Sequence, residues 1–168
     1  RSLLLMRGAR AALRGDNDTL AQNLLDGVSP GALNERDQAA FELLRIQTFI
    51  ADKPPSEGLK YLPIPEDGTP AEVAAQTWAL RAKLFYQVGD ITQATHALVQ
   101  REVWLLEPDQ IQDNHRTLWE RLRERAPDAD AANAAGDKTT AGWLALANIG
   151  NHVWADRSEL ERALQRWS

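Results

Sequence analysis

The stretch from Thr69 to Pro108, TPAEVAAQTWALRAKLFYQVGDITQATHALVQREVWLLEP, contains two helical patterns separated by a break at Gly89. Apolar residues recur every three or four positions on both sides of the break, which is the spacing of an amphipathic helix. The opening Thr-Pro-Ala-Glu is typical of a helix start, with a threonine cap, a proline at the first helical position and a glutamate that closes a capping box. Asp90 offers the second helix a similar cap. The stretch therefore predicts a helix, a tight turn and a second helix.

Large and small residues follow a set register along this helical pair. Large side chains stand at Trp78, Phe85 and Leu98, and small ones at Ala82 and Ala94. With the glycine at the turn, these are positions at which tetratricopeptide (TPR) repeats, units of about 34 residues, use large and small residues. The pattern predicts a TPR-like helical hairpin and indicates no chemistry.

A second glycine turn indicates repetition. Gly15 is followed by aspartate, as Gly89 is, and the two glycines are 74 residues apart, which is two periods of 37. The first repeat opens with an apolar stripe at helical spacing that consists of Leu3, Leu4, Ala9, Ala12 and Leu13. We expect three degenerate repeats and a set of C-terminal helices, at about residues 1–30, 33–63, 69–107 and 108–168.

The fold class predicted for the whole chain is all-α, because no stretch alternates apolar and polar residues as a strand does. The expected architecture is one domain, a TPR-like superhelix of about nine or ten antiparallel helices. Its middle repeat has a long first helix capped by Asn34 and a short second helix that ends before Pro63. The last helix is expected to start at Ser158.

The composition excludes several kinds of site. The chain has 168 residues, a net charge of −5 and no cysteine, so disulfides, thiol nucleophiles and cysteine metal sites are excluded. An acidic balance without basic runs argues against a nucleic-acid partner. The chain starts on an arginine and stops just after Trp167, so we expect a piece of a longer protein whose signal peptide and lipid-attachment cysteine lie upstream.

The sequence motifs give little support for a catalytic site or a metal site. His96, His115 and His152 fall on three different predicted helices, and none has metal-site spacing. Motifs of nucleotide-binding loops and serine nucleophiles do not occur. Carboxylate pairs, the groups that hydrolyse glycosidic bonds, stand at Glu66/Asp67, Glu120/Glu124 and Asp128/Asp130. They lie in loops or beside arginines, where solvated ion pairs are the simpler interpretation. We predict a non-enzymatic protein with no catalytic residue, metal or cofactor.

Six tryptophans are many for a chain of this length. Trp78, Trp119 and Trp143 lie beside leucine or alanine on apolar helical faces, where core packing is expected. Trp104 and Trp154 have fewer apolar neighbours in the sequence. They are the candidates for an exposed surface that stacks on sugars or bases.

The front helix of each TPR-like repeat lines a concave groove. In the third repeat this places Gln76, Lys83, Tyr86 and Gln87 in the groove, together with Ala79. Such grooves bind extended segments or helices of other proteins, and Lys83 with Tyr86 offers a charge and an amphipathic anchor. A solvated face without a ligand is the alternative interpretation.

Four short segments carry a resemblance to a known family. Residues 114–122 read NHRTLWERL, an N-x-x-x-x-W-x-x-L element, and residues 142–147 read GWLALA. Residues 160–167 read LERALQRW, and residues 3–9 read LLLMRGA. Together with the degenerate repeats, these segments resemble the amino-terminal domain of LpoA-type (YraM-like) lipoproteins over nearly the whole chain.

The resemblance implies an outer-membrane lipoprotein of a Gram-negative bacterium, on the periplasmic side, that activates a class A penicillin-binding protein. That family acts by binding and brings no catalytic residues. Its contact with the synthase is implied to lie in a following α/β domain, so this chain is expected to be a scaffold or spacer with membrane contact only through the lipid anchor. A further expected partner for the groove is either peptidoglycan or a second protein of the envelope. The alternatives are a helical domain of a cell-wall lytic enzyme and a generic TPR adaptor.

Overall fold

A computed structural model describes residues 1–124 and 130–148 of the chain. These residues form helices and short turns with no strand among them, which confirms the predicted all-α class. The elements are α1 (Ser2–Arg14), α2 (Asp18–Asp26), the 3-10 turn η1 (Pro30–Ala32), α3 (Glu35–Ile50), α4 (Pro55–Tyr61), α5 (Ala71–Gln87), α6 (Ile91–Glu102), α7 (Pro108–Glu124) and α8 (Asp130–Ala134). Residues 138–148 are also helical, up to the end of the described segment.

Eight α-helices have both ends among the described residues, against the nine or ten expected for the whole chain, and the helical stretch 138–148 comes in addition to these eight. The helix expected from Ser158 lies outside the described residues. The TPR-like superhelix stays a prediction. The α3–α4 pair departs from a regular repeat, because α4 has only 7 residues against the 16 of α3.

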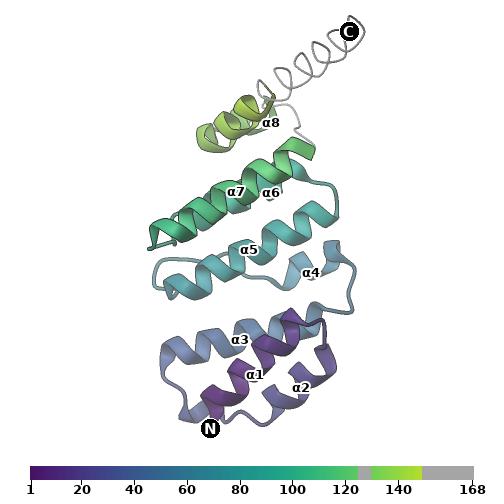
Figure 1. The fold of residues 1–168 in the computed structure, drawn as a ribbon, viewed down its shortest axis with the longest axis vertical. Helices are drawn as coiled ribbons and strands as arrows, with labels where there is room; N and C mark the ends of the chain where they lie inside the picture. The colour runs from purple at the N-terminus through teal and green to yellow at the C-terminus, as the bar shows by residue number, and fades with distance from the viewer. Residues whose placement is uncertain (125–129, 149–168) are drawn as a thin grey trace, which may run out of the picture.

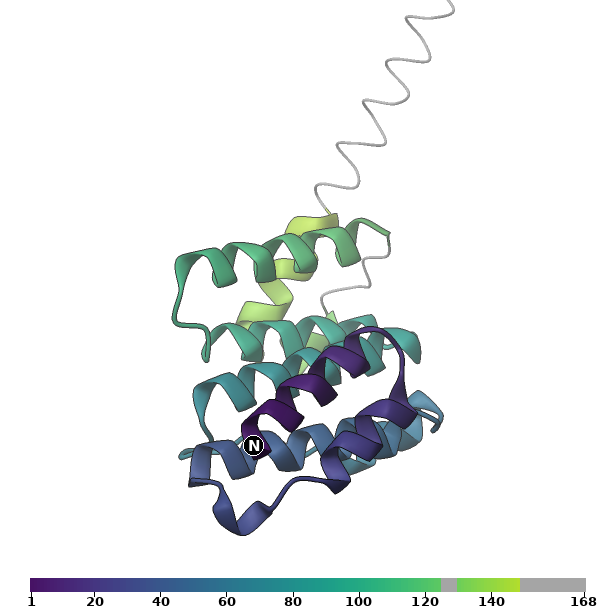
Figure 2. The same cartoon turned by 60° about the horizontal axis from the view of Figure 1, so that its bottom comes forward.

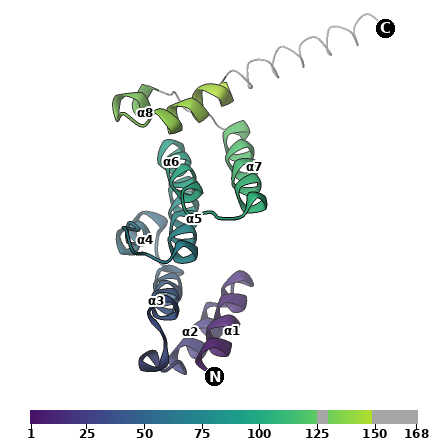
Figure 3. The ribbon, with the colours of Figure 1, turned by 90° about the vertical axis from the view of Figure 1, so that its left-hand side faces the viewer.

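The helices stack in layers along the longest axis of the described chain (Figure 1). The α1–α2 pair forms one end, and Figure 2 brings this pair and its short connecting turn forward. From the side, α3, α5 and α6 form a central column, with α4 on one side and α1 and α7 on the other (Figure 3). The extensive contacts all join helices that are adjacent or next but one along the chain. The described fold is therefore nearly one-dimensional, as in repeat proteins.

Short polar side chains cap the starts of α2, α3 and α6. The side-chain oxygens of Asn17, Asn34 and Asp90 each accept a hydrogen bond from the backbone amide three residues further on, at 3.0, 2.8 and 3.0 Å. Such caps satisfy amides that the first helical turn leaves unpaired. The caps predicted at Asn34 and Asp90 are confirmed.

The capping box predicted at the start of α5 is wrong. Pro70 stands at the cap position without a side-chain hydrogen bond, and Thr69 Oγ1 accepts instead from an upstream backbone amide at 3.2 Å. The carboxylate of Glu72 turns away to other helices, where it lies 3.3 Å from Arg10 of α1 and 3.0 Å from Arg36 of α3. Exposed ion pairs are individually weak, but these two connect three layers of the stack.

A left-handed glycine followed by a capping aspartate forms two of the turns. Gly89 has a φ of 84°, and the amides of Gly89 and Asp90 donate to carbonyls in the last turn of α5. This is a Schellman motif, which satisfies carbonyl groups at the end of a helix. Gly136, with a φ of 76°, and Asp137 repeat the arrangement after α8. The sequence patterns did not predict this second turn.

The expected equivalence of Gly15 with Gly89 is wrong by one residue. Gly15 has a φ of −97°, and the left-handed residue is Asp16, with a φ of 52°. The amide of Asn17 then donates to the carbonyl of Ala12 at 2.9 Å. Aspartate is among the few non-glycine residues that adopt this conformation readily, so a glycine is not required there.

Replacing Gly89 by alanine tests the left-handed turn. An added Cβ would meet no heavy atom within 4 Å, so the cost is that of the backbone conformation alone. We expect Gly89→Ala to lower the free energy of unfolding by about 1 kcal/mol, measured by urea denaturation. Gly31→Ala is the matched control, because the space there is equally open and the φ is not left-handed. Equal losses at the two positions would contradict this account.

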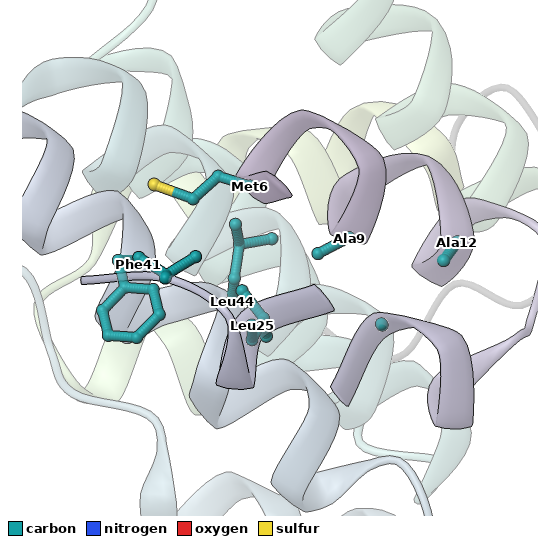
Figure 4. Packing of buried hydrophobic residues seen from close by; sticks show 8 residues of the cluster. Met6, Ala9, Ala12, Leu25, Phe41 and Leu44 are labelled. Carbon is teal, nitrogen blue, oxygen red and sulfur yellow. The ribbon is translucent and has the colours of Figure 1, made fainter. Parts of the chain in front are cut away.

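Apolar residues from three helices form the N-terminal core (Figure 4). Met6 and Ala9 come from α1, Leu25 from α2, and Phe41 and Leu44 from α3, and all five are buried. Burying a leucine, methionine or phenylalanine side chain contributes roughly 1.5–3 kcal/mol to stability. This shared core holds the first layer of the stack to the second.

The apolar stripe expected along α1 is only partly buried. Ala9 is fully covered, but the side chains of Leu3 and Leu4 are 47% and 70% exposed. The buried face of α1 consists of Met6, Ala9 and Ala12. Helical spacing identified the helix and two of its three buried residues, Ala9 and Ala12, but it missed Met6 and included the exposed Leu3 and Leu4.

Further apolar clusters follow along the stack. Leu43 of α3 packs in a cluster with residues of α5, and Trp78 of α5 packs in one with residues of α6 and with Leu118 of α7. Leu122 of α7 shares the last cluster with Leu144 of the helical stretch 138–148. These contacts place α7 beside the α5–α6 pair, where the candidate site lies.

Candidate functional site

A small cavity of about 110 Å³ lies between α5, α6 and α7. Its apolar lining includes three small side chains, those of Ala79, Ala82 and Ala94. Three basic residues, one from each helix, also line it: Lys83, Arg101 and Arg121. None of the lining residues is acidic. The cavity therefore combines a shallow apolar surface with positive charge, although the whole chain is acidic.

The structure brings two of the four predicted groove residues together. Lys83 and Tyr86 line the cavity, as does Ala79. Gln76 does not line it, and its side-chain amide donates to Glu72 at 3.3 Å. Gln87, at the end of α5, is exposed and also lies outside the lining. Protein binding by these residues stays a prediction.

Arg121 and Arg101 are held in place by neighbouring side chains. The guanidinium carbon of Arg121 lies 4.0 Å from the ring centroid of Tyr86, a cation–π contact. Arg101 Nη1 donates to Asn114 Oδ1 at 3.1 Å. Burial lowers the pKa of Arg101, while the charge of Asp113 raises it. A guanidinium has so high an ordinary pKa that Arg101 stays charged.

Sequence reasoning missed Arg101, Thr117 and Arg121 as cavity residues. On α7, Thr117 and Arg121 are four positions apart and so share one face of the helix, a signal that the sequence does contain. Which face of α7 meets α5 depends on long-range packing of residues such as Leu118. Helical periodicity alone does not specify that packing.

Two of the three histidines are paired with carboxylates. His96 Nδ1 lies 2.5 Å from Asp137 Oδ2, and His115 Nε2 lies 2.8 Å from Glu102 Oε2. Within residues 1–124 and 130–148, no group of three or more histidine, aspartate or glutamate side chains could hold a metal ion. His152 lies outside the described residues. Both described pairs connect different helical segments, which is a structural role.

The Asp137 carboxylate makes stability depend on pH. Burial raises its pKa, but hydrogen bonds from the Thr140 side chain and amide and from His96 outweigh this effect and hold the pKa below its ordinary value. A lowered pKa contributes stability above the unfolded value near 3.9, and that contribution is lost as the pH falls through the folded pKa. We expect the free energy of unfolding to fall as the pH drops from about 5 to below about 3.5. Urea denaturation across this range should show a smaller fall in Asp137→Asn.

The candidate carboxylate pairs lie on the surface where they are described. Glu66, Asp67, Glu120 and Asp130 are exposed. Asp128 lies outside the described residues, as does the side chain of Glu124. The absence of a catalytic residue stays a prediction.

The described tryptophans lie at or near the core. Trp78 is 7% exposed, which confirms its predicted packing role. Trp119 and Trp143 are half-buried against apolar clusters. Trp104, a candidate for exposure, is also half-buried, because it packs against the cluster around Trp78. Trp154, the other candidate, lies outside the described residues.

The motif residues near the C-terminal end are packing residues. Asn114 and Leu122, the first and last positions of the N-x-x-x-x-W-x-x-L element, are both 0% exposed. Asn114 Nδ2 donates to the carbonyl of Leu98 at 2.9 Å and so ties α7 to α6. In the GWLALA element, Leu144 and Ala147 are 0% and 1% exposed. These elements therefore specify how the last layers dock.

Comparison with protein families gives a match to the family described as LppC putative lipoprotein, over residues 1–168. The chain belongs to the LppC family. This confirms the resemblance that the motif residues indicated. A comparison with curated proteins and one with solved structures found no match.

Because the chain belongs to the LppC family, the site is part of a lipoprotein of the bacterial envelope. Within the described residues, no helix has both the length and the apolar character needed to cross a bilayer. The family match assigns no ligand to the cavity between α5, α6 and α7.

Proposed function

We propose that this chain is a non-catalytic helical arm of an LppC-family lipoprotein that activates peptidoglycan synthesis by a class A penicillin-binding protein. The arm acts on the periplasmic side of the outer membrane, between a lipid anchor and an activating domain. The observation that carries the proposal is the layered stack, in which each layer buries an apolar cluster against the next. Such a stack holds its ends at a set separation, as a spacer must.

A flexible replacement of the arm tests this function. The full-length lipoprotein is compared with a variant in which residues 1–168 are replaced by a Gly/Ser linker, which behaves as a random coil. We expect the variant to activate the purified synthase in solution as the full-length protein does. In cells we expect it to fail, because the activating domain no longer reaches the synthase.

Two results would overturn the spacer role. Loss of activation in solution would mean that the arm itself takes part in the activating contact. Full activation in cells with the flexible linker would mean that a stiff arm is not required. Equal amounts of the two proteins in the membrane fraction are the necessary control.

A further inference from the structure

The positive charge of the cavity has no acidic counterpart in its lining. Lys83 is exposed and has no ion-pair partner among the described residues. Asp113, the acid that acts on Arg101, is itself 3.0 Å from Arg116. Three cations and no acidic residue thus line the cavity, and the acid that acts on Arg101 is shared with a fourth basic side chain. An anionic group is the ligand that such a site would hold.

The basic residues retain hydrogen-bonding capacity for a ligand. A guanidinium has five N–H donors in a planar fork, which matches the two oxygens of a carboxylate. Arg101 uses Nη1 for Asn114 and its Nε is buried, so we count Arg101 for its positive charge alone. Arg121 contacts Tyr86 through its guanidinium face, so its N–H edge can still donate. The cavity therefore offers both charge and directed donors.

The apolar lining restricts what can accompany the anion. Ala79, Ala82 and Ala94 leave space close to the helix backbones, and the volume of about 110 Å³ suits a group no larger than a small residue. A methyl side chain next to a carboxylate fits both features. A bare phosphate would leave the apolar surface without a partner.

We propose that this cavity binds the C-terminal carboxylate of a peptide that ends in alanine. The carboxylate lies between Lys83 and Arg121, with Arg101 beneath it, and the terminal methyl group lies on the alanine surface. This assignment goes beyond the spacer role, because it gives the arm a ligand of its own. A D-alanine end would come from a cell-wall peptide and an L-alanine end from a protein chain.

Calorimetric titration of the purified protein tests the assignment. The probes are N-acetylated tripeptides ending in two D-alanines or in two L-alanines, each as the free acid and as the C-terminal amide. We expect at least one free acid to bind and its amide to bind at least about tenfold more weakly. The D- and L-forms show which source the site prefers, and binding of either acid supports the proposal.

Variants locate the binding to the cavity. Lys83→Gln and Arg121→Gln should each weaken binding of the acid by about tenfold, because each removes one charged contact. Arg123→Gln is the matched control, since Arg123 is exposed on the same helix and does not line the cavity. Unchanged thermal unfolding of each variant shows that a loss of binding is not a loss of folding.

Several outcomes would overturn the proposal. The proposal fails if neither tripeptide acid binds at about 10 mM, or if a tripeptide acid and its amide bind equally well. It also fails if the acid binds the Arg123→Gln control no more tightly than it binds the Lys83→Gln and Arg121→Gln variants. Inorganic phosphate that binds as tightly as the peptide would show an unselective anion site and would also overturn it. The spacer function is tested separately by activation in cells, so either idea can fail while the other stands.

Discussion

Leu44→Ala is expected to lower the free energy of unfolding by about 2–5 kcal/mol. Leu44 is 2% exposed and packs with Met6 of α1, Leu25 of α2 and Phe41 of α3. Truncation removes apolar contacts with three helices at once and leaves a cavity that the backbone can fill only in part. Urea denaturation followed by circular dichroism measures the loss.

Because the helices form a one-dimensional stack, we also expect the destabilisation to be concentrated near the substituted layer. Each layer contacts mainly its neighbours, so damage to the N-terminal core should destabilise α1 and α2 more than α6. Amide hydrogen exchange in Leu44→Ala should therefore accelerate more in residues 2–26 than in residues 91–102.

Leu4→Ala is the matched control for this prediction. It removes the same atoms from a side chain that is 70% exposed, so we expect a change within about 0.5 kcal/mol. If Leu44→Ala costs no more than Leu4→Ala, the described N-terminal core is wrong. A uniform acceleration of exchange would instead show that the stack unfolds as one unit.

Features governed by neighbours in sequence were predictable. The turn at Gly89 and the caps at Asn34 and Asp90 depend on residues within a few positions of one another. The all-α class follows from helical spacing for the same reason. Lys83 and Tyr86 were predicted to share a face, and the structure places both at the cavity.

Features that depend on competition from distant residues were not predictable. Glu72 was expected to close a capping box, but Arg10 and Arg36 on two other helices attract its carboxylate. The apolar stripe of α1 left open which of its leucines would be covered, because the covering helices are α2 and α3. Arg101 and Arg121 join one site only because α7 docks on the α5–α6 pair.

That docking depends on a polar side chain in an apolar setting. Asn114 is 0% exposed, accepts from Arg101 Nη1 at 3.1 Å and donates to the Leu98 carbonyl at 2.9 Å. A buried polar group that loses its partner costs about 1–3 kcal/mol, so fully paired groups favour one arrangement of helices over others. Asn114 thereby sets the position of α7 and also orients Arg101 in the cavity.

Asn114→Leu should consequently cost about 2–4 kcal/mol in the free energy of unfolding, although it replaces a buried side chain with one of similar size and greater apolarity. The loss arises because the Leu98 carbonyl and the Arg101 guanidinium both lose a buried partner. Gln112→Ala is the control on the same helix, where the side chain is exposed and little change is expected.

A double-mutant cycle separates the hydrogen bonds of Asn114 from its volume. If the bond to Arg101 carries part of the loss, Arg101→Leu will cost less in the Asn114→Leu background than in the wild type, with a coupling energy of about 1 kcal/mol or more. Zero coupling would mean that the two side chains contribute independently and that Asn114 acts through the Leu98 carbonyl alone. A stabilising Asn114→Leu would show that apolar packing, rather than this buried polar link, positions α7 on the α5–α6 pair.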